Sequence, residues 1–104
     1  MSDDPLYDPL HKQAIQLDHK VRDFIGGDHS HPSASMLQRE VRQLQEDFEM
    51  RKHPRTIEGR IKTIQNQLRQ SQNLSNSYMN YNEFDYLHDT FEDMRMNLRK
   101  LRNY

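Results

Sequence analysis

Cysteine and tryptophan are absent from this chain of 104 residues, which also has only three glycines and four prolines. Without cysteine there is no disulfide, no thiolate zinc site and no thiol nucleophile. The glycines form no phosphate-binding loop, dinucleotide fingerprint or Gly-x-Ser-x-Gly motif. The common catalytic motifs are therefore missing, and we expect a protein that is not an enzyme and uses no cofactor.

Long apolar runs are also lacking, since none approaches the roughly 20 residues that a membrane-spanning helix needs. The polar, acidic start of the chain, Met1-Ser2-Asp3-Asp4, does not resemble a signal peptide. Mean hydropathy is -1.18 and the formal net charge is -1. We expect a soluble, cytoplasmic protein with no membrane partner and no overall charge bias toward nucleic acid.

Apolar residues recur at spacings of three and four in four segments, which is the pattern of amphipathic helices. We predict helices at about 9–25, 35–52, 56–71 and 82–102, and no strands. These form one all-α domain over 1–104, a mostly antiparallel four-helix bundle. A three-helix bundle with a loosely attached N-terminal helix is the alternative. The predicted core positions are Leu10, Ala14, Leu17, Val21 and Phe24; Leu37, Val41, Leu44 and Phe48; Ile57, Ile61, Ile64 and Leu68; and Phe84, Leu87, Phe91, Met94, Leu98 and Leu101.

Helix ends are predicted from capping residues. Asp8 suits the start of the first helix, and Gly26-Gly27 suits its end. Ser35, with Gln38 three residues on, suits a capping box at the start of the second helix. Pro54 is expected to end that helix, the third helix is expected to begin near Thr56, and Asn82 is expected to cap the fourth.

A cluster of basic residues lies around the predicted connection between the second and third helices. It comprises Arg51, Lys52, Arg55, Arg60 and Lys62. Such a cluster beside a helix N-terminus could bind an anion or nucleic acid. Glu46, Asp47, Glu49 and Glu58 interrupt it, so a solvated helix corner is the simpler expectation.

Tyrosine and methionine gather before and within the fourth helix, at Tyr78, Met79, Tyr81 and Tyr86. These side chains offer large apolar area with polar or adaptable ends, and are enriched in protein interfaces. We interpret the four residues as a candidate surface for binding a protein partner.

Three histidine groups have a spacing that metal ligands can have, but we do not expect them to bind a metal. Asp8 and His11 have an Asp-x-x-His spacing in the first predicted helix. His29 and His31 follow Asp28 in a predicted loop, and His88 lies between Asp85 and Glu92 just outside a predicted core stripe. No pair of acidic residues falls on a predicted core position, where burial would raise a pKa enough for general acid catalysis.

The main functional hypothesis is a small non-catalytic protein–protein interaction module, acting as an adaptor, assembly factor or regulator. The thin predicted core favours a protein partner or a homodimer. The alternatives are a nucleic-acid-associated regulator that uses the basic residues at 51–62, and a metal-binding helical bundle.

Overall fold

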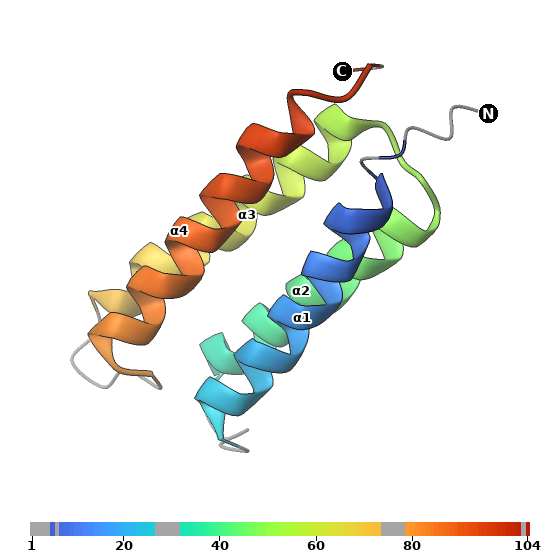
Figure 1. Ribbon diagram of the computed structural model, residues 1–104. Helices are drawn as coiled ribbons and strands as arrows, with labels where there is room; N and C mark the ends of the chain where they lie inside the picture. The colour runs from blue at the N-terminus through green and yellow to red at the C-terminus, as the bar shows by residue number, and fades with distance from the viewer. Residues whose placement is uncertain (1–4, 6, 27–31, 74–78, 103) are drawn as a thin grey trace.

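The computed structural model describes residues 5, 7–26, 32–73, 79–102 and 104. These ranges contain four helices and no strand: α1 (Tyr7–Ile25), α2 (Pro32–Glu49), α3 (Pro54–Gln72) and α4 (Tyr81–Leu98). Successive helices run in opposite directions along a bundle of 45 × 20 × 17 Å (Figure 1). The predicted all-α, antiparallel four-helix bundle is confirmed, with α1 packed along α2.

The core lies along the bundle axis and consists of the predicted apolar stripes with one exception. Phe24 is only partly buried, and Ile25, one residue later, is 4% exposed in its place. Tyr7, Ala34 and Met79 also join the core. Burial of these apolar side chains is the main force that holds the four helices together, because each helix is polar on its outer face.

The helices begin at residues other than the predicted caps. His53 caps α3, with its ring Nδ1 accepting a hydrogen bond from the Arg55 backbone N–H, and Pro54 opens the helix instead of ending α2. Asn80 caps α4 in place of Asn82. Ser35 lies inside α2 rather than at its cap, because the helix already includes Pro32.

Helix α2 ends in a Schellman arrangement centred on a residue that is not glycine. The Lys52 N–H donates to the Asp47 carbonyl and the Arg51 N–H donates to the Phe48 carbonyl, both at 3.0 Å. This pairing places Arg51 in the left-handed region, with φ of 52°. Gly26 takes the same kind of conformation after α1, with φ of 65°, as expected from the sequence.

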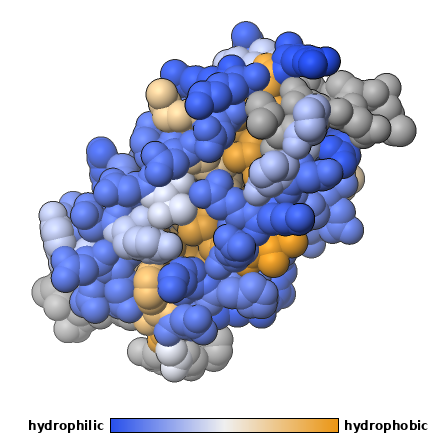
Figure 2. All heavy atoms as spheres, in the orientation of Figure 1, coloured by the Kyte–Doolittle hydropathy of each residue, from blue (hydrophilic) through white to orange (hydrophobic). Residues whose placement is uncertain are grey.

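Helices α1 and α4 contact each other much less than the other neighbouring pairs do. In the orientation of Figure 1, apolar atoms remain visible along the line between these two helices (Figure 2). One long side of the bundle is therefore incompletely closed. Within the described ranges, no helix combines the length and apolar content needed to cross a bilayer.

Candidate functional site

The five predicted basic residues make contacts within the chain. The Arg51 guanidinium lies 3.2 Å from Asp8 and stacks over the Tyr7 ring. The Arg55 Nε donates to the Tyr104 carbonyl at 2.9 Å. The remaining three pair with carboxylates: Lys52 with Asp47, Arg60 with both Asp47 and Glu40, and Lys62 with Glu58.

Asp47 is the centre of this network and is fully buried. Its carboxylate accepts a hydrogen bond from the Arg60 Nε and lies 3.1 Å from the Lys52 ammonium. Burial lowers the pKa of Arg60, but hydrogen bonds and charge from Asp47 and Glu40 outweigh it and raise that pKa above its ordinary value. The basic cluster thus joins the end of α2 to the start of α3.

Glu58 is a second buried carboxylate, 5% exposed on α3. It accepts hydrogen bonds from the Arg99 Nε at 2.9 Å and from the Tyr104 hydroxyl at 2.8 Å. Burial raises the pKa of Glu58, yet these two hydrogen bonds and the charge of Arg99 lower it below its ordinary value overall. Glu58 therefore stays ionised and ties the C-terminal end of the chain to α3.

Of the four tyrosine and methionine residues predicted to bind a partner, two are exposed within the described part of the chain. Tyr78 lies outside the described residues, and Met79 is 5% exposed and belongs to the core. Tyr81 and Tyr86 are exposed, at 68% and 49%. Of these residues, Tyr86 borders the incompletely closed side of the bundle.

Two neighbouring cavities lie between α1 and α4. The larger, of about 390 Å³, extends from Gln13 to Asp23 on α1 and reaches Tyr86 and Thr90 on α4. The smaller, of about 240 Å³, lies between Leu10 on α1 and Asn97 and Lys100 near the end of α4. Gln13 lines both cavities, which lie one after the other along the same two helices, and we call the two together the α1–α4 groove.

The groove has an apolar floor and largely uncharged walls. Leu10 and Leu17 form part of the floor, and both are almost completely buried. The Tyr86 ring meets the Phe24 ring edge-on, with 6.0 Å between centroids. The Lys20 ammonium lies over these two rings, 5.7 Å from Phe24 and 6.0 Å from Tyr86. This cation–π contact helps to hold the two aromatic rings together at one end of the groove.

Sequence reasoning identified Tyr86 but missed its partners on α1. The three-four spacing predicts that Phe24 lies in the core. No pattern in the sequence distinguishes Lys20 from other exposed lysines. The half-buried Gln13 and the exposed Gln16 and Lys20 form a row on α1 that carries amides and a cation where a closed bundle would carry apolar residues. That row is the signal that could have indicated an open side.

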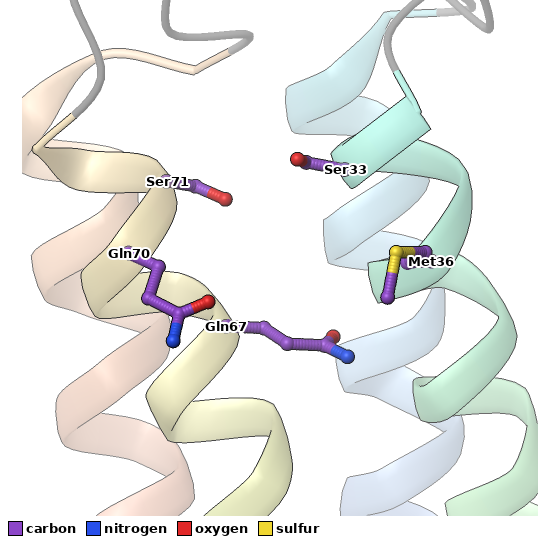
Figure 3. Close-up of a pocket in the computed structure, with 5 residues that line it drawn as sticks. All are labelled: Ser33, Met36, Gln67, Gln70 and Ser71. Atoms are coloured by element: carbon purple, nitrogen blue, oxygen red, sulfur yellow. The ribbon is translucent and has the colours of Figure 1, made fainter.

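A third cavity of about 230 Å³ lies at the end of the bundle where α2 begins and α3 ends. Figure 3 shows Gln67 extending from α3 toward Met36 of α2, while Ser33 and Ser71 point toward each other across the opening. The Gln67 Oε1 atom is buried and has no hydrogen-bond partner within the described part of the chain. The lining offers hydroxyls and amides but no charged group for acid–base chemistry.

Of the three histidine groups noted in the sequence, those of His11 and His88 lie within the described residues. In the described ranges, no three histidine or acidic side chains are placed to hold one ion. His11 stacks against Phe48, and Glu92 is hydrogen-bonded by Gln65 and Arg95. Asp28, His29 and His31 lie outside the described residues.

Comparison with known proteins gives no further guidance. No protein-family model matches the chain, and no curated protein or solved structure is significantly similar to it. Functional inference therefore depends on the geometry of this bundle.

Proposed function

We propose that this chain is a non-catalytic protein-interaction module that binds an amphipathic helix of a partner protein in the α1–α4 groove. The observation that carries the proposal is the groove itself, which is lined by the half-exposed Tyr86 ring and by the edges of Leu10 and Leu17 along one side of the bundle. A helix laid in such a groove would complete the packing that α1 and α4 leave open.

The dimensions of the groove suit a helix. It extends from Pro9 to Asp23 on α1, which corresponds to about 21 Å at 1.5 Å per residue. A partner helix of about four turns would therefore fill it, with apolar residues at about i, i+7 and i+14 facing Leu10, Leu17 and Tyr86, which lies beside Phe24. Tyr86 is the expected anchor, because a half-exposed tyrosine at the edge of an apolar site is typical of interface hot spots.

The charged residues of the groove indicate which charges the partner helix should carry. Lys100 lies at one end, beside Leu10, and Lys20 lies at the other. Ten residues of α1 separate Leu10 from Lys20, or about 15 Å along the helix axis. We therefore expect acidic residues about three turns apart on the partner. Asp23 also lines the groove, so the groove lacks the row of like charges that nucleic acid binding requires.

The experiment is an affinity purification from source cells with the native chain and two variants. Tyr86→Lys places a cation in the groove, whereas Met50→Lys changes a residue that is 69% exposed and does not line it. We expect a stoichiometric protein that survives nuclease treatment, binds the Met50→Lys variant and is lost with Tyr86→Lys. A peptide covering its predicted helix should bind with micromolar affinity, and a central proline should abolish binding.

Three results would contradict the proposal. Capture that Tyr86→Lys leaves unchanged would exclude the groove. Capture that nuclease removes would favour the alternative in which nucleic acid is the ligand. A dimer of the native chain in sedimentation that Tyr86→Lys dissociates would mean that a second copy, rather than a foreign helix, occupies the groove.

We also propose that the module acts in the cytoplasm, in keeping with a chain that has no cysteine.

A further inference from the structure

A separate cleft with a positive lining lies between α3 and α4. Its volume is about 200 Å³, and its charged lining residues are Lys62, Arg69 and Arg95, with Glu92 as the one carboxylate. With His88 neutral, these groups leave a net charge of +2 around a small cavity. None of its lining residues belongs to the α1–α4 groove.

Arg95 is held in place before any ligand binds. Its Nη1 donates to the Gln65 Oε1 at 3.1 Å and to the Glu92 Oε2 at 3.0 Å. Gln65 is buried, and its Nε2 donates to the same Glu92 oxygen at 2.9 Å and to the His88 carbonyl at 3.3 Å. The hydrogen bond from Gln65 has the largest effect on Glu92 and, together with the charge of Arg95 and its hydrogen bond, lowers the pKa of Glu92 despite burial. This network fixes the guanidinium between the two helices.

The other two cations of the cleft, Lys62 and Arg69, make fewer contacts within the described part of the chain than Arg95 does. The Arg69 side chain is exposed and has no ion pair or hydrogen bond within the described part of the chain. The Lys62 ammonium is 3.8 Å from Glu58, a carboxylate that already accepts hydrogen bonds from Arg99 and Tyr104. Lys62 and Arg69 are seven residues apart and lie on the same face of α3, about 10 Å from each other along the axis. Their charges are available to an anion between them.

We propose that this α3–α4 cleft binds a phosphate group. A tetrahedral dianion matches the net charge of the lining, and arginine donors suit its oxygens. The cavity is smaller than the roughly 300–1,000 Å³ of most small-molecule sites, so it fits the phosphate itself rather than a whole nucleotide. The five basic residues predicted from the sequence include Lys62 but not Arg69, which lies two turns further along α3, or Arg95, which meets Lys62 only when α3 and α4 pack.

The test is a titration of the ¹⁵N-labelled protein with inorganic phosphate, with chloride at equal ionic strength as the reference. We expect saturable amide shifts at residues 62–69 and 88–95, with a dissociation constant in the millimolar range. Arg69→Gln should weaken binding by about tenfold, as expected for loss of one charged hydrogen bond. Arg42→Gln, which removes an exposed arginine of α2 outside the cleft, should leave binding unchanged.

A parallel titration with methyl phosphate distinguishes the two sources of the group. Tighter binding of the ester than of free phosphate would support a phosphorylated metabolite as ligand, and weaker binding would support free phosphate. Shifts that follow ionic strength alone, or that Arg69→Gln and Arg42→Gln reduce equally, would overturn the proposal. Both variants change exposed positions, so circular dichroism should show unchanged helix content.

Discussion

At the scale of single residues, Arg51 adopts a backbone conformation that normally favours glycine. Its φ of 52° lies in the left-handed region, where a side chain costs about 1 kcal/mol or more. The same conformation brings its guanidinium to Asp8 and over the Tyr7 ring, while the Tyr7 hydroxyl donates to the Lys52 carbonyl. The strain at the end of α2 is thus offset by contacts with the start of α1.

This explanation predicts different effects of two substitutions at residue 51. Arg51→Ala keeps the left-handed strain and loses both contacts, whereas Arg51→Gly loses the contacts but removes the strain. We expect the glycine variant to be more stable than the alanine variant by about 1 kcal/mol. Urea denaturation of the two variants measures the difference. Equal stabilities would show that the backbone here is not strained.

Glu58 makes stability depend on pH. Its pKa is lowered in the folded state from an ordinary value of 4.5, so the folded protein favours the ionised form. The stabilisation from Glu58 is complete above about pH 4.5. It is lost as the pH falls through the lower pKa of the folded state. We expect the native chain to exceed Glu58→Gln in stability at pH 7 and this difference to shrink steadily below 4.5. A difference that stays constant down to pH 3 would contradict the assignment.

At the scale of single elements, the predicted cap of α4, Asn82, is wrong, because the helix is capped by Asn80. The Asn80 side chain accepts a hydrogen bond from the Glu83 N–H at 2.9 Å, and the Glu83 carboxylate accepts one from the Asn80 N–H at 3.0 Å. Asn82 is an exposed residue inside the first turn. The spacing of Asn80 and Glu83 is that of a capping box and was the signal available in the sequence.

Alanine substitutions at these two asparagines test the assignment. Asn80→Ala should cost about 1 kcal/mol of stability, because it leaves N–H groups of the first turn without their acceptor. Asn82→Ala should change stability by less than about 0.5 kcal/mol. Thermal unfolding followed by circular dichroism measures both. The reverse order would mean that the helix begins two residues later.

Also at this scale, the apolar spacing predicted that each helix exists and which face it turns to the core. It did not predict that charged residues next to that face would be buried. The three-four spacing identifies positions that face the bundle axis, and Phe91 and Ile61 lie there as expected. Asp47 and Glu58 flank those positions and become buried only because neighbouring helices cover them. Their partners are Arg60 and Arg99, and the latter pairing joins residues 41 apart in sequence. Spacing within one helix contains no information about such pairs.

At the scale of the whole molecule, α1 and α4 close the bundle less completely than the other pairs do. The sequence predicted the four-helix arrangement, because the stripes and short connections leave few alternatives. It did not predict which side would stay open, since that depends on how polar residues from two distant segments face each other. Of the groove residues, only Tyr86 belongs to the partner-binding set predicted from the sequence, and Leu10 and Leu17 belong to the predicted core.

Phe91 tests whether the core is shared by the whole bundle. Its ring is fully buried on α4. Phe91→Ala should cost about 3–5 kcal/mol, because it removes buried apolar area and leaves a cavity. Chemical denaturation should show this loss in one cooperative transition. A cost below about 1 kcal/mol would mean that the α4 stripe is not part of a packed core.

The most direct measurement for the proposed function is photo-crosslinking from the groove in source cells. A benzophenone amino acid replaces Tyr86 in one preparation and Met50 in another, since both side chains are exposed but only Tyr86 lines the groove. We expect position 86 to crosslink to a helical segment of one protein that carries acidic residues about three turns apart, and position 50 not to do so. Equal crosslinking from both positions, or crosslinking to nucleic acid alone, would contradict a helix-binding groove between α1 and α4.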